Sequence, residues 1–327
     1  MKKIFFITFI ALVLIALGCA WFASFRFKST PRSDLKIDSQ KSAVAITMLK
    51  KDVLELAGKI GARSTTHYEN LIRASEYLQG RYSELGYEPR LQTYKAAGFD
   101  VSNIYAVKPS ATPGAENLII GAHYDTQYSN PGADDNASGV AVLLALMKSL
   151  SSTSLNKTIH FVCLVNEELP HSHSPAMGAF QYAKWVFEQK LPVAGMISLE
   201  SVGYFDSSRG SQRYPFQFMS WLYPDRGDFI AVVGNLKSHN LVSSITRAFH
   251  ESSPIQAEGA VLPQFIRDIA RSDHWAFWKF GFEAVMITDT ANFRNANYHK
   301  ATDHPDTLNY EKIYEVYLGL NQFLANQ

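Results

Sequence analysis

Short apolar runs alternate with segments of helical periodicity through most of this chain. Strand-length runs lie at residues 103–107, 117–123, 159–165, 194–200, 228–234 and 284–288, and helical spacing is found at 41–61, 68–86, 138–150, 177–189 and 241–252. Continuous apolar strands are typical of a parallel sheet that is covered on both faces. The alternation therefore predicts an α/β fold, a three-layer sandwich with a mostly parallel central sheet flanked by helices. We expect residues 37–327 to form one domain.

The first 32 residues differ from the rest in both hydropathy and charge. Residues 4–25 are 22 uncharged, mostly apolar positions with basic residues on either side. This length is about enough for a helix to cross a membrane, whereas a secretory signal needs a shorter run and small residues for cleavage, such as those at 18–20. We expect residues 1–32 to be a signal peptide or membrane anchor, and the folded domain to begin after Pro31. That domain would be exported: membrane-anchored outside the cytoplasm, or periplasmic or secreted if the segment is cleaved.

Composition narrows the functional class. The 327 residues include 31 basic and 30 acidic side chains. Nucleic-acid binders carry a basic excess, so we expect no nucleic-acid partner. Two cysteines, Cys19 and Cys163, are too few for a disulfide framework. Cys163 lies inside an apolar run and is expected to be a buried thiol.

Residues that can bind metal ions follow several of the predicted strands. These candidates are His123 with Asp125, Asp134 with Asp135 at the entry to the next helix, Glu167 with Glu168, Glu200, and finally His299 with Asp303 and Asp306. Taken singly, an aspartate pair before a helix is usually a cap, and adjacent glutamates usually decorate a solvated edge. Ligands collect at the carboxyl ends of strands in open α/β sheets, so the convergence predicts a metal site. Imidazole with carboxylate oxygen suits zinc.

The order of these motifs resembles the zinc aminopeptidase family M28. HYD at 123–125, GADDNASG at 132–139, NEE at 166–168, LE at 199–200, SDH at 272–274 and YHKATDHPDTL at 298–308 occur in the family's order, across roughly residues 40–325. The resemblance implies two zinc ions per chain, held by five residues. His123 binds one ion and Glu168 the other, Asp135 bridges both, and Glu200 and His299 complete the respective sites. Many relatives have Asp where Glu200 stands.

The two adjacent glutamates should have different roles. Neighbouring side chains of an extended chain point to opposite faces, so one should bind metal while the other faces the attacking water. We expect Glu167 to be the general base and acid. Asp125 is placed to accept the second ring N–H of His123, which is a catalytic positioning role. Three carboxylate ligands against the +4 of two zinc ions leave a positive centre for the oxyanion.

Other polar residues near the motifs are expected to be structural. His171 and His173 are expected in a solvated loop, and Asp273 and His274 are expected to hold their loop by hydrogen bonds. His299, and not His304, matches the position of the family's histidine ligand. Some relatives carry a tyrosine upstream of SDH that assists the oxyanion, but this chain reads Ile-Ala-Arg at 269–271, so that role has no assigned residue.

These observations favour a zinc-dependent aminopeptidase that hydrolyses amino-terminal residues from peptides. One alternative is a single-zinc acyltransferase that resembles glutaminyl cyclases, which share the fold and a related ligand set. The other is a membrane-tethered binding ectodomain that has lost catalysis. The complete ligand set disfavours the second alternative more strongly than the first.

Overall fold

The computed structural model describes residues 26–30, 32 and 34–327. The predicted membrane anchor or signal at residues 4–25 lies outside these described residues. Within them, no helix combines the length and the apolar character that crossing a bilayer requires.

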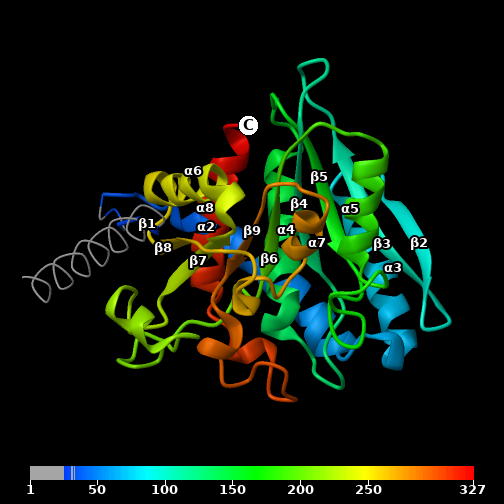
Figure 1. The fold of residues 1–327 in the computed structure, drawn as a ribbon. Coiled ribbons are helices and arrows are strands. Elements are labelled where there is room, and N and C mark those ends of the chain that lie inside the picture. The colour runs from blue at the N-terminus through cyan, green and yellow to red at the C-terminus, as the bar shows by residue number, and fades with distance from the viewer. Residues whose placement is uncertain (1–25, 31, 33) are drawn as a thin grey trace, which may run out of the picture.

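A mixed sheet of nine strands forms the centre of the molecule (Figure 1). In spatial order the strands are β1 (Arg26–Lys28), β8 (Gln256–Val261), β7 (Phe229–Gly234), β9 (Ala284–Thr288), β6 (Val193–Glu200), β4 (Asn117–His123), β5 (Thr158–Leu164), β3 (Phe99–Lys108) and β2 (Arg90–Ala96). The central strands β9, β6, β4 and β5 are parallel. The prediction of a mostly parallel sheet is wrong at the flanks, where β2, β3 and β1 pair antiparallel, as do β7 and β9. Hydropathy reports burial but not strand direction, which explains the error.

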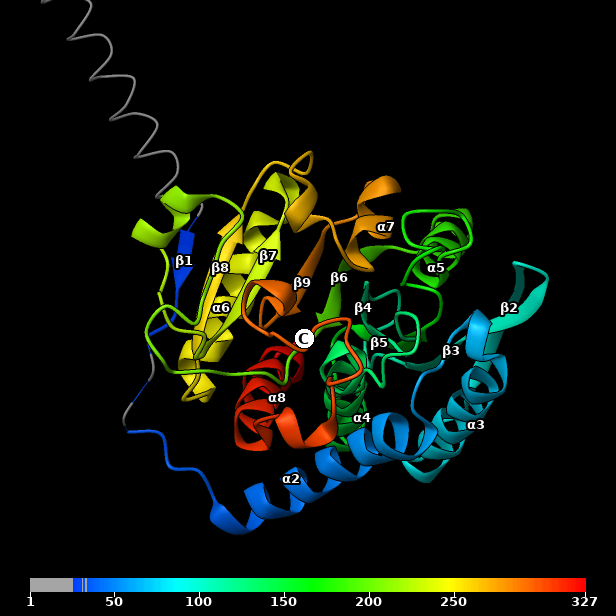
Figure 2. The ribbon, with the colours of Figure 1, turned by 90° about the horizontal axis from the view of Figure 1, so that it is seen from below.

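Helices cover both faces of this sheet (Figure 2). One layer contains α2 (Ser39–Val53), α3 (Tyr68–Glu84), α4 (Gly139–Leu150), α6 (His239–Ser252) and α8 (Tyr310–Ala325), and the other contains α5 (Gly178–Glu188) and α7 (His274–Lys279). Buried aliphatic side chains of the sheet pack against each layer. The predicted sandwich of helices around a sheet is thus present.

The register of the central strands places their carboxyl ends side by side. His123 at the end of β4 pairs with Leu164 at the end of β5. On the other side, Ala122 pairs with Leu199 of β6. All seven residues of β4 are buried, which fixes this strand within the core. The residues that end β4, follow β5 and end β6 therefore meet at one edge of the sheet.

The sheet begins earlier in the chain than the expected boundary at Pro31. Arg26 and Lys28 of β1 lie opposite Ala260 and Glu258 of β8. Arg26 Nη2 is 3.2 Å from a carboxylate oxygen of Glu258, which is buried. The basic residues that follow the apolar segment therefore serve as cross-strand partners of a carboxylate more than 200 residues away, a contact that hydropathy does not reveal.

Candidate metal centre

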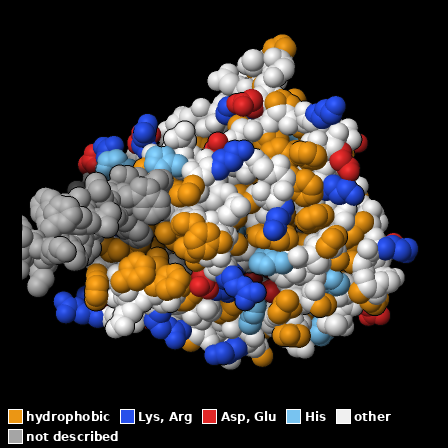
Figure 3. Space-filling view, viewed as in Figure 1, with side chains coloured by type: hydrophobic (Ala, Val, Ile, Leu, Met, Phe, Trp, Pro, Cys, Tyr) orange, Lys and Arg blue, Asp and Glu red, His pale blue; other side chains and the backbone are white. Residues whose placement is uncertain are grey.

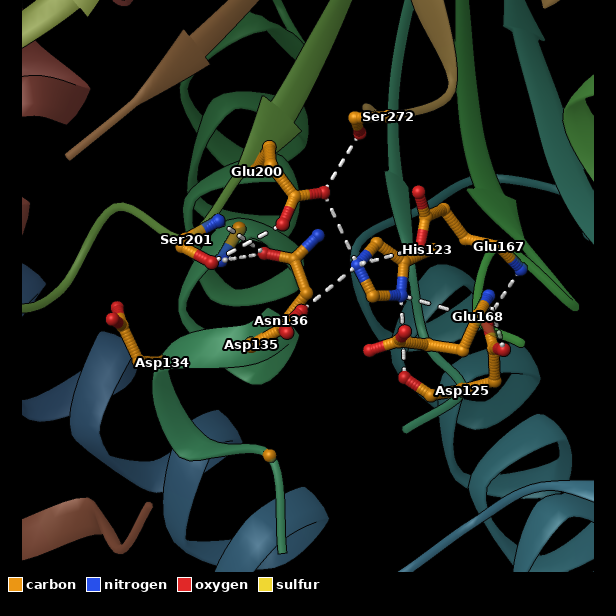
Figure 4. A network of polar contacts seen from close by, with 12 residues as sticks. His123, Asp125, Asp134, Asp135, Asn136, Glu167, Glu168, Glu200, Ser201 and Ser272 are labelled. Atoms are coloured by element: carbon orange, nitrogen blue, oxygen red, sulfur yellow. Dashed lines mark hydrogen bonds and ion pairs between the residues drawn. The ribbon is translucent and has the colours of Figure 1, made fainter. Parts of the chain in front are cut away.

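The first half of the site is built around His123. Its Nε2 atom lies 3.1 Å from Asp135 Oδ1 and 3.3 Å from Glu200 Oε2. His123 and Glu200 end neighbouring strands, whereas Asp135 comes from the helical turn Ala133–Ser138 that precedes α4. Figure 4 shows both carboxylates facing the same nitrogen of the His123 imidazole.

The second half is built around His299, in the turn after β9. His299 Nε2 is 3.0 Å from Asp135 Oδ2 and 3.2 Å from Glu168 Oε1. The two oxygens of Asp135 therefore face different imidazoles. A carboxylate in this position can contact two cations at once.

Glu167 occupies a different position from its neighbour. Its Oε2 atom is 4.0 Å from His123 Nε2, farther than the 3.1 Å that separates Asp135 Oδ1 from the same nitrogen. Proximity alone groups Glu167 with His123 and Glu200, but Asp135 is the nearer third ligand. The backbone at Asn166 is left-handed, with φ of 61°, just before the glutamate pair. This turn breaks the extended path and lets Glu167 and Glu168 reach different parts of the same site.

The donor atoms fit metal ions. The buried polar atoms without a hydrogen-bonding partner in the described chain include Nε2 of both histidines, both carboxylate oxygens of Asp135, and Oε1 of Glu168. Buried polar atoms are normally paired, since leaving one unpaired costs about 1–3 kcal/mol. Five such atoms on four converging side chains (His123, Asp135, Glu168 and His299) are what a metal site requires, and their nitrogen and oxygen chemistry is that of zinc.

The many carboxylates of the cluster also favour the binding of cations. Six buried carboxylates meet here: Asp125, Asp135, Glu167, Glu168, Glu200 and Asp273. Burial, together with Asp135, raises the pKa of Glu168 to about 8. Burial likewise raises the pKa of Asp273 to about 8. Although burial opposes a charged imidazole, Glu200 and contacts with other carboxylates raise the pKa of His123 well above its usual value. Cations would relieve this mutual repulsion.

Two aspartates hold the loops that present the ligands. Asp125 accepts hydrogen bonds from the backbone N–H groups of Glu167 and Glu168, at 3.1 and 3.2 Å. Its carboxylate also lies 3.5 Å from His123 Nδ1, while its backbone carbonyl is 3.2 Å from the same nitrogen. Asp303 accepts in the same way from the N–H groups of Asp134 and Asp135. Each ligand-bearing loop is thus tied to one carboxylate by two successive amides.

Glu200 and the helical turn are oriented by further hydrogen bonds. Ser272 Oγ donates to Glu200 Oε2 at 2.7 Å, and Ser201 Oγ donates to Oε1 at 3.2 Å. Asn136 donates to the carbonyl of Leu199 and accepts from the N–H of Ser201. The end of β6 and the turn that carries Asp135 are therefore joined directly.

Several candidate residues lie apart from the ligand cluster. Asp134 is turned away from it (Figure 4) and accepts from the N–H of Gly203 and the side chain of Asn295. His304 and Asp306 are exposed. Asp134 is thus a structural residue that ties the turn to distant segments, and it is not the helix cap that an aspartate before a helix usually is.

The expectations for the other polar residues are partly wrong. His171 is buried and contacts Thr65 Oγ1, so its loop is not solvated at that point. His173 is exposed, as expected for a solvated loop, and its ring stacks on Trp275. His274 donates to the carbonyl of Ile269, as a loop-holding residue should. Asp273 is buried beside the cluster, and neither of its carboxylate oxygens has a hydrogen-bonding partner. Side-chain direction within these loops is set by tertiary packing, which the local sequence does not show.

Arg63 is a structural support that the motifs did not reveal. Its guanidinium is fully buried and donates to the carbonyls of Leu56, Gly61, Tyr124, Pro131 and Gly132. It thereby connects the loop after β4 to the loop that leads into the turn of Asp135. A basic residue in a polar stretch gives no signal in the sequence that it will be buried in this way.

A cavity opens beside the ligand cluster. Glu200 and Tyr298 line one part of it, and most of the remaining wall is apolar, including Phe229, Met286 and Phe293. Arg271 also lines it and donates to the Tyr298 hydroxyl at 3.0 Å. The ring of Tyr298 stacks on the His299 imidazole, with centroids 3.8 Å apart. Tyr298 is the second residue that sequence reasoning passed over, although it directly precedes an expected ligand.

Comparison with known proteins places this geometry in a family. A family model for "Peptidase family M28" matches residues 103–323. "Uncharacterized protein YfbL" of Escherichia coli K12 is 40% identical over 287 residues, which cover 85% of this chain and 87% of that protein. Among solved structures, the zinc aminopeptidase BSAP of Bacillus subtilis has a TM-score of 0.63 at 14% identity, covering 85% of this chain and 94% of that one. A glutaminyl cyclase of Fimbriiglobus ruber has the same TM-score of 0.63 at 19% identity, covering 91% of this chain and 100% of that one. These two likenesses establish the fold and do not separate the two activities.

Proposed function

The chain belongs to peptidase family M28 and is a metallo-exopeptidase, and we propose that it is a zinc-dependent aminopeptidase with two metal ions. Its substrates would be peptides with a free amino terminus. One observation carries the proposal: the oxygens of Asp135 lie 3.1 and 3.0 Å from the Nε2 atoms of two different histidines. A carboxylate whose two oxygens face two imidazoles in this way is suited to bridging two metal ions.

Five residues would hold the ions. His123 and Glu200 would bind one, Glu168 and His299 the other, and Asp135 both. Zinc ions bound there would supply Lewis acidity and make water a nucleophile near neutral pH. Asp125 would keep the His123 imidazole in the tautomer that leaves Nε2 free to bind metal.

Glu167 would move the proton. Its carboxylate is buried and lies next to the ligands without the short imidazole contacts that Asp135, Glu168 and Glu200 make. It would take a proton from the attacking water as the carbon–oxygen bond forms, and deliver it to the amine as the peptide bond breaks. The backbone N–H of Glu167 is held by Asp125, which fixes the start of this side chain.

Tyr298 would stabilise the oxyanion. Because Arg271 donates to the tyrosine oxygen, the hydroxyl hydrogen of Tyr298 is free to point toward the substrate. The tyrosine lines the cavity together with Glu200, a member of the ligand cluster. The apolar walls of the same cavity favour a large apolar side chain on the amino-terminal residue.

The cyclase-like alternative makes a different product. A cyclase releases ammonia from amino-terminal glutamine and leaves the number of residues unchanged, whereas an aminopeptidase releases a free amino acid. We therefore propose to incubate the protein with leucyl-initiated and glutaminyl-initiated peptides and to analyse the products by mass spectrometry. Release of the first residue, with no reaction of an amino-terminally acetylated peptide, is the expected result. Cyclised glutaminyl peptide without cleavage would overturn the proposal.

The adjacent glutamates provide a matched pair of variants. Glu167→Gln should lower turnover about 10²- to 10⁴-fold, as for the loss of a general base, while zinc content stays unchanged. Glu168→Gln should instead lower the affinity for zinc. Undiminished hydrolysis by Glu167→Gln would remove Glu167 from this role, and an inactive variant with no zinc would assign it to metal binding.

The proposal also concerns the location of the peptidase domain in the cell. Residues 37–327 would form the peptidase domain, preceded by β1, and the 22 uncharged residues from 4 to 25 would act as a signal or anchor that places it outside the cytoplasm. Protease treatment of intact spheroplasts of cells producing the full chain is the test. Degradation of the domain in intact spheroplasts is expected, and protection until lysis would contradict export.

A further inference from the structure

Four aromatic side chains project from one end of the molecule: Phe216, Phe218, Trp221 and Phe265. We call them the aromatic patch. Trp221 and Phe265 are each 82% exposed, and the rings of Phe216 and Phe218 stack with centroids 5.7 Å apart. Figure 3 shows hydrophobic side chains gathered at this end. Large apolar side chains exposed together are unfavourable in water and mark a contact surface.

The patch is held on the end of the sheet that carries β1. Met219 and Tyr223, from the same segment as Trp221, form a small core with Ala260 of β8. Leu262, three residues before Phe265, packs against this core. The guanidinium of Arg26 in β1 lies over the ring of Tyr223, 4.8 Å from its centroid. Strand β1 therefore contacts the base of the segment that bears most of the patch.

The position of β1 indicates what the patch contacts. The 22 uncharged residues 4–25 end one position before Arg26. A membrane that holds this apolar segment would therefore begin beside β1, and the patch, which is attached to β1 through Tyr223, would lie at its surface. Tryptophan is enriched at the interface of a bilayer, and phenylalanine is common on the apolar faces of elements that lie in this interface.

The charges near β1 agree with a lipid surface. Lys28 has half of its side chain exposed, and Arg26 about a quarter. Both cations share a single acidic partner, the carboxylate of Glu258. The excess of positive charge suits anionic head groups, which attract basic residues that lie next to a membrane segment.

We propose that the aromatic patch inserts into the interfacial region of the bilayer that holds residues 4–25, so that the peptidase domain lies against the membrane. The proposal depends on insertion of that segment and is independent of the peptidase activity. The cavity beside the ligand cluster lies behind the patch, since Phe216 also lines it.

Lipid quenching of tryptophan fluorescence tests the proposal in the full chain. The protein is reconstituted in vesicles of phosphatidylcholine and phosphatidylglycerol, with or without lipids that carry bromine near the head-group end of their acyl chains. The difference between wild type and Trp221→Phe isolates the signal of Trp221. Trp21→Phe reports the apolar segment in the same way, and Trp185→Phe on α5 is the matched control away from the patch. Trp221 is exposed and does not line the cavity, so Trp221→Phe should fold normally and remain active.

We expect the brominated lipids to quench the Trp221 signal several-fold more strongly than the Trp185 signal. Quenching of Trp21 without quenching of Trp221 would overturn the proposal, because the segment would then be inserted while the patch remains in water. Absence of quenching at both positions would overturn it as well. Trp221 emission could instead shift with protein concentration and not be quenched by brominated lipid. That result would overturn the proposal and assign the patch to contact between copies of the chain.

Discussion

Asp125→Asn offers a demanding test of how the ligands are held. The two oxygens of Asp125 accept from the N–H groups of Glu167 and Glu168, at 3.1 and 3.2 Å. Asparagine offers one oxygen and one NH₂ group, so in either orientation one buried N–H loses its acceptor and faces a donor. A hydrogen bond to a charged group contributes about 1.5–3 kcal/mol. If the lost hydrogen bond destabilises the metal-bound state by this amount, zinc affinity should decrease about 10- to 100-fold. This is the range seen when residues that orient metal ligands are changed.

The measurement is a zinc titration against a chromophoric chelator, with kcat/KM on a leucyl substrate determined at saturating zinc. Asp306→Asn is the matched control, because it makes the same chemical change at an exposed position in a different motif, residues 298–308. We expect Asp306→Asn to behave as wild type. Zinc affinity of Asp125→Asn within about twofold of wild type, a difference of under about 0.5 kcal/mol, would refute the reasoning.

Two further predictions concern stability. Arg63→Met removes hydrogen bonds to five backbone carbonyls. We expect this substitution to lower the free energy of unfolding, measured in urea, by at least about 4 kcal/mol. A loss below about 1 kcal/mol would be inconsistent with the structure. Burial lowers the pKa of His160 to about 4 from an unfolded value of 6.5, so the unfolded state binds the proton more readily between these values. The stability that a neutral His160 provides is complete above pH 6.5 and declines by about 3 kcal/mol as the pH falls to about 4. His160→Gln should flatten the urea stability profile in this window, and an unchanged slope would contradict it.

The central strands could be predicted from the sequence because burial on both faces leaves continuous apolar runs. The run 117–123 coincides with β4, and 284–288 coincides with β9. Strand β8 was missed because it contains Glu258 and Gly259, which are unfavourable in an isolated strand. The buried carboxylate of Glu258 is accommodated by Arg26 and Lys28 of β1, which lie 3.2 and 4.0 Å from it and are distant in the sequence.

Part of the candidate site could likewise be predicted and part could not. Strand ends and motif order identified the five expected ligands, which the fold brings within contact of one another. The residues that hold the ligand-bearing loops in place were harder to predict. Arg63 and Asn136 act through backbone groups of distant segments, and such bonds leave no side-chain pattern in the sequence. The pairing of Arg271 with Tyr298 likewise depends on how two loops pack.

Metal content is the most direct test of the two-metal site. The full chain and its Asp135→Asn variant would be purified without chelator, equilibrated with zinc, freed of unbound metal and measured by plasma mass spectrometry. The bridging position of Asp135 predicts two tightly bound zinc ions per wild-type chain, and weakened binding of both ions in the variant. A single ion in the wild-type protein, or a variant that still holds two ions tightly, would contradict the account.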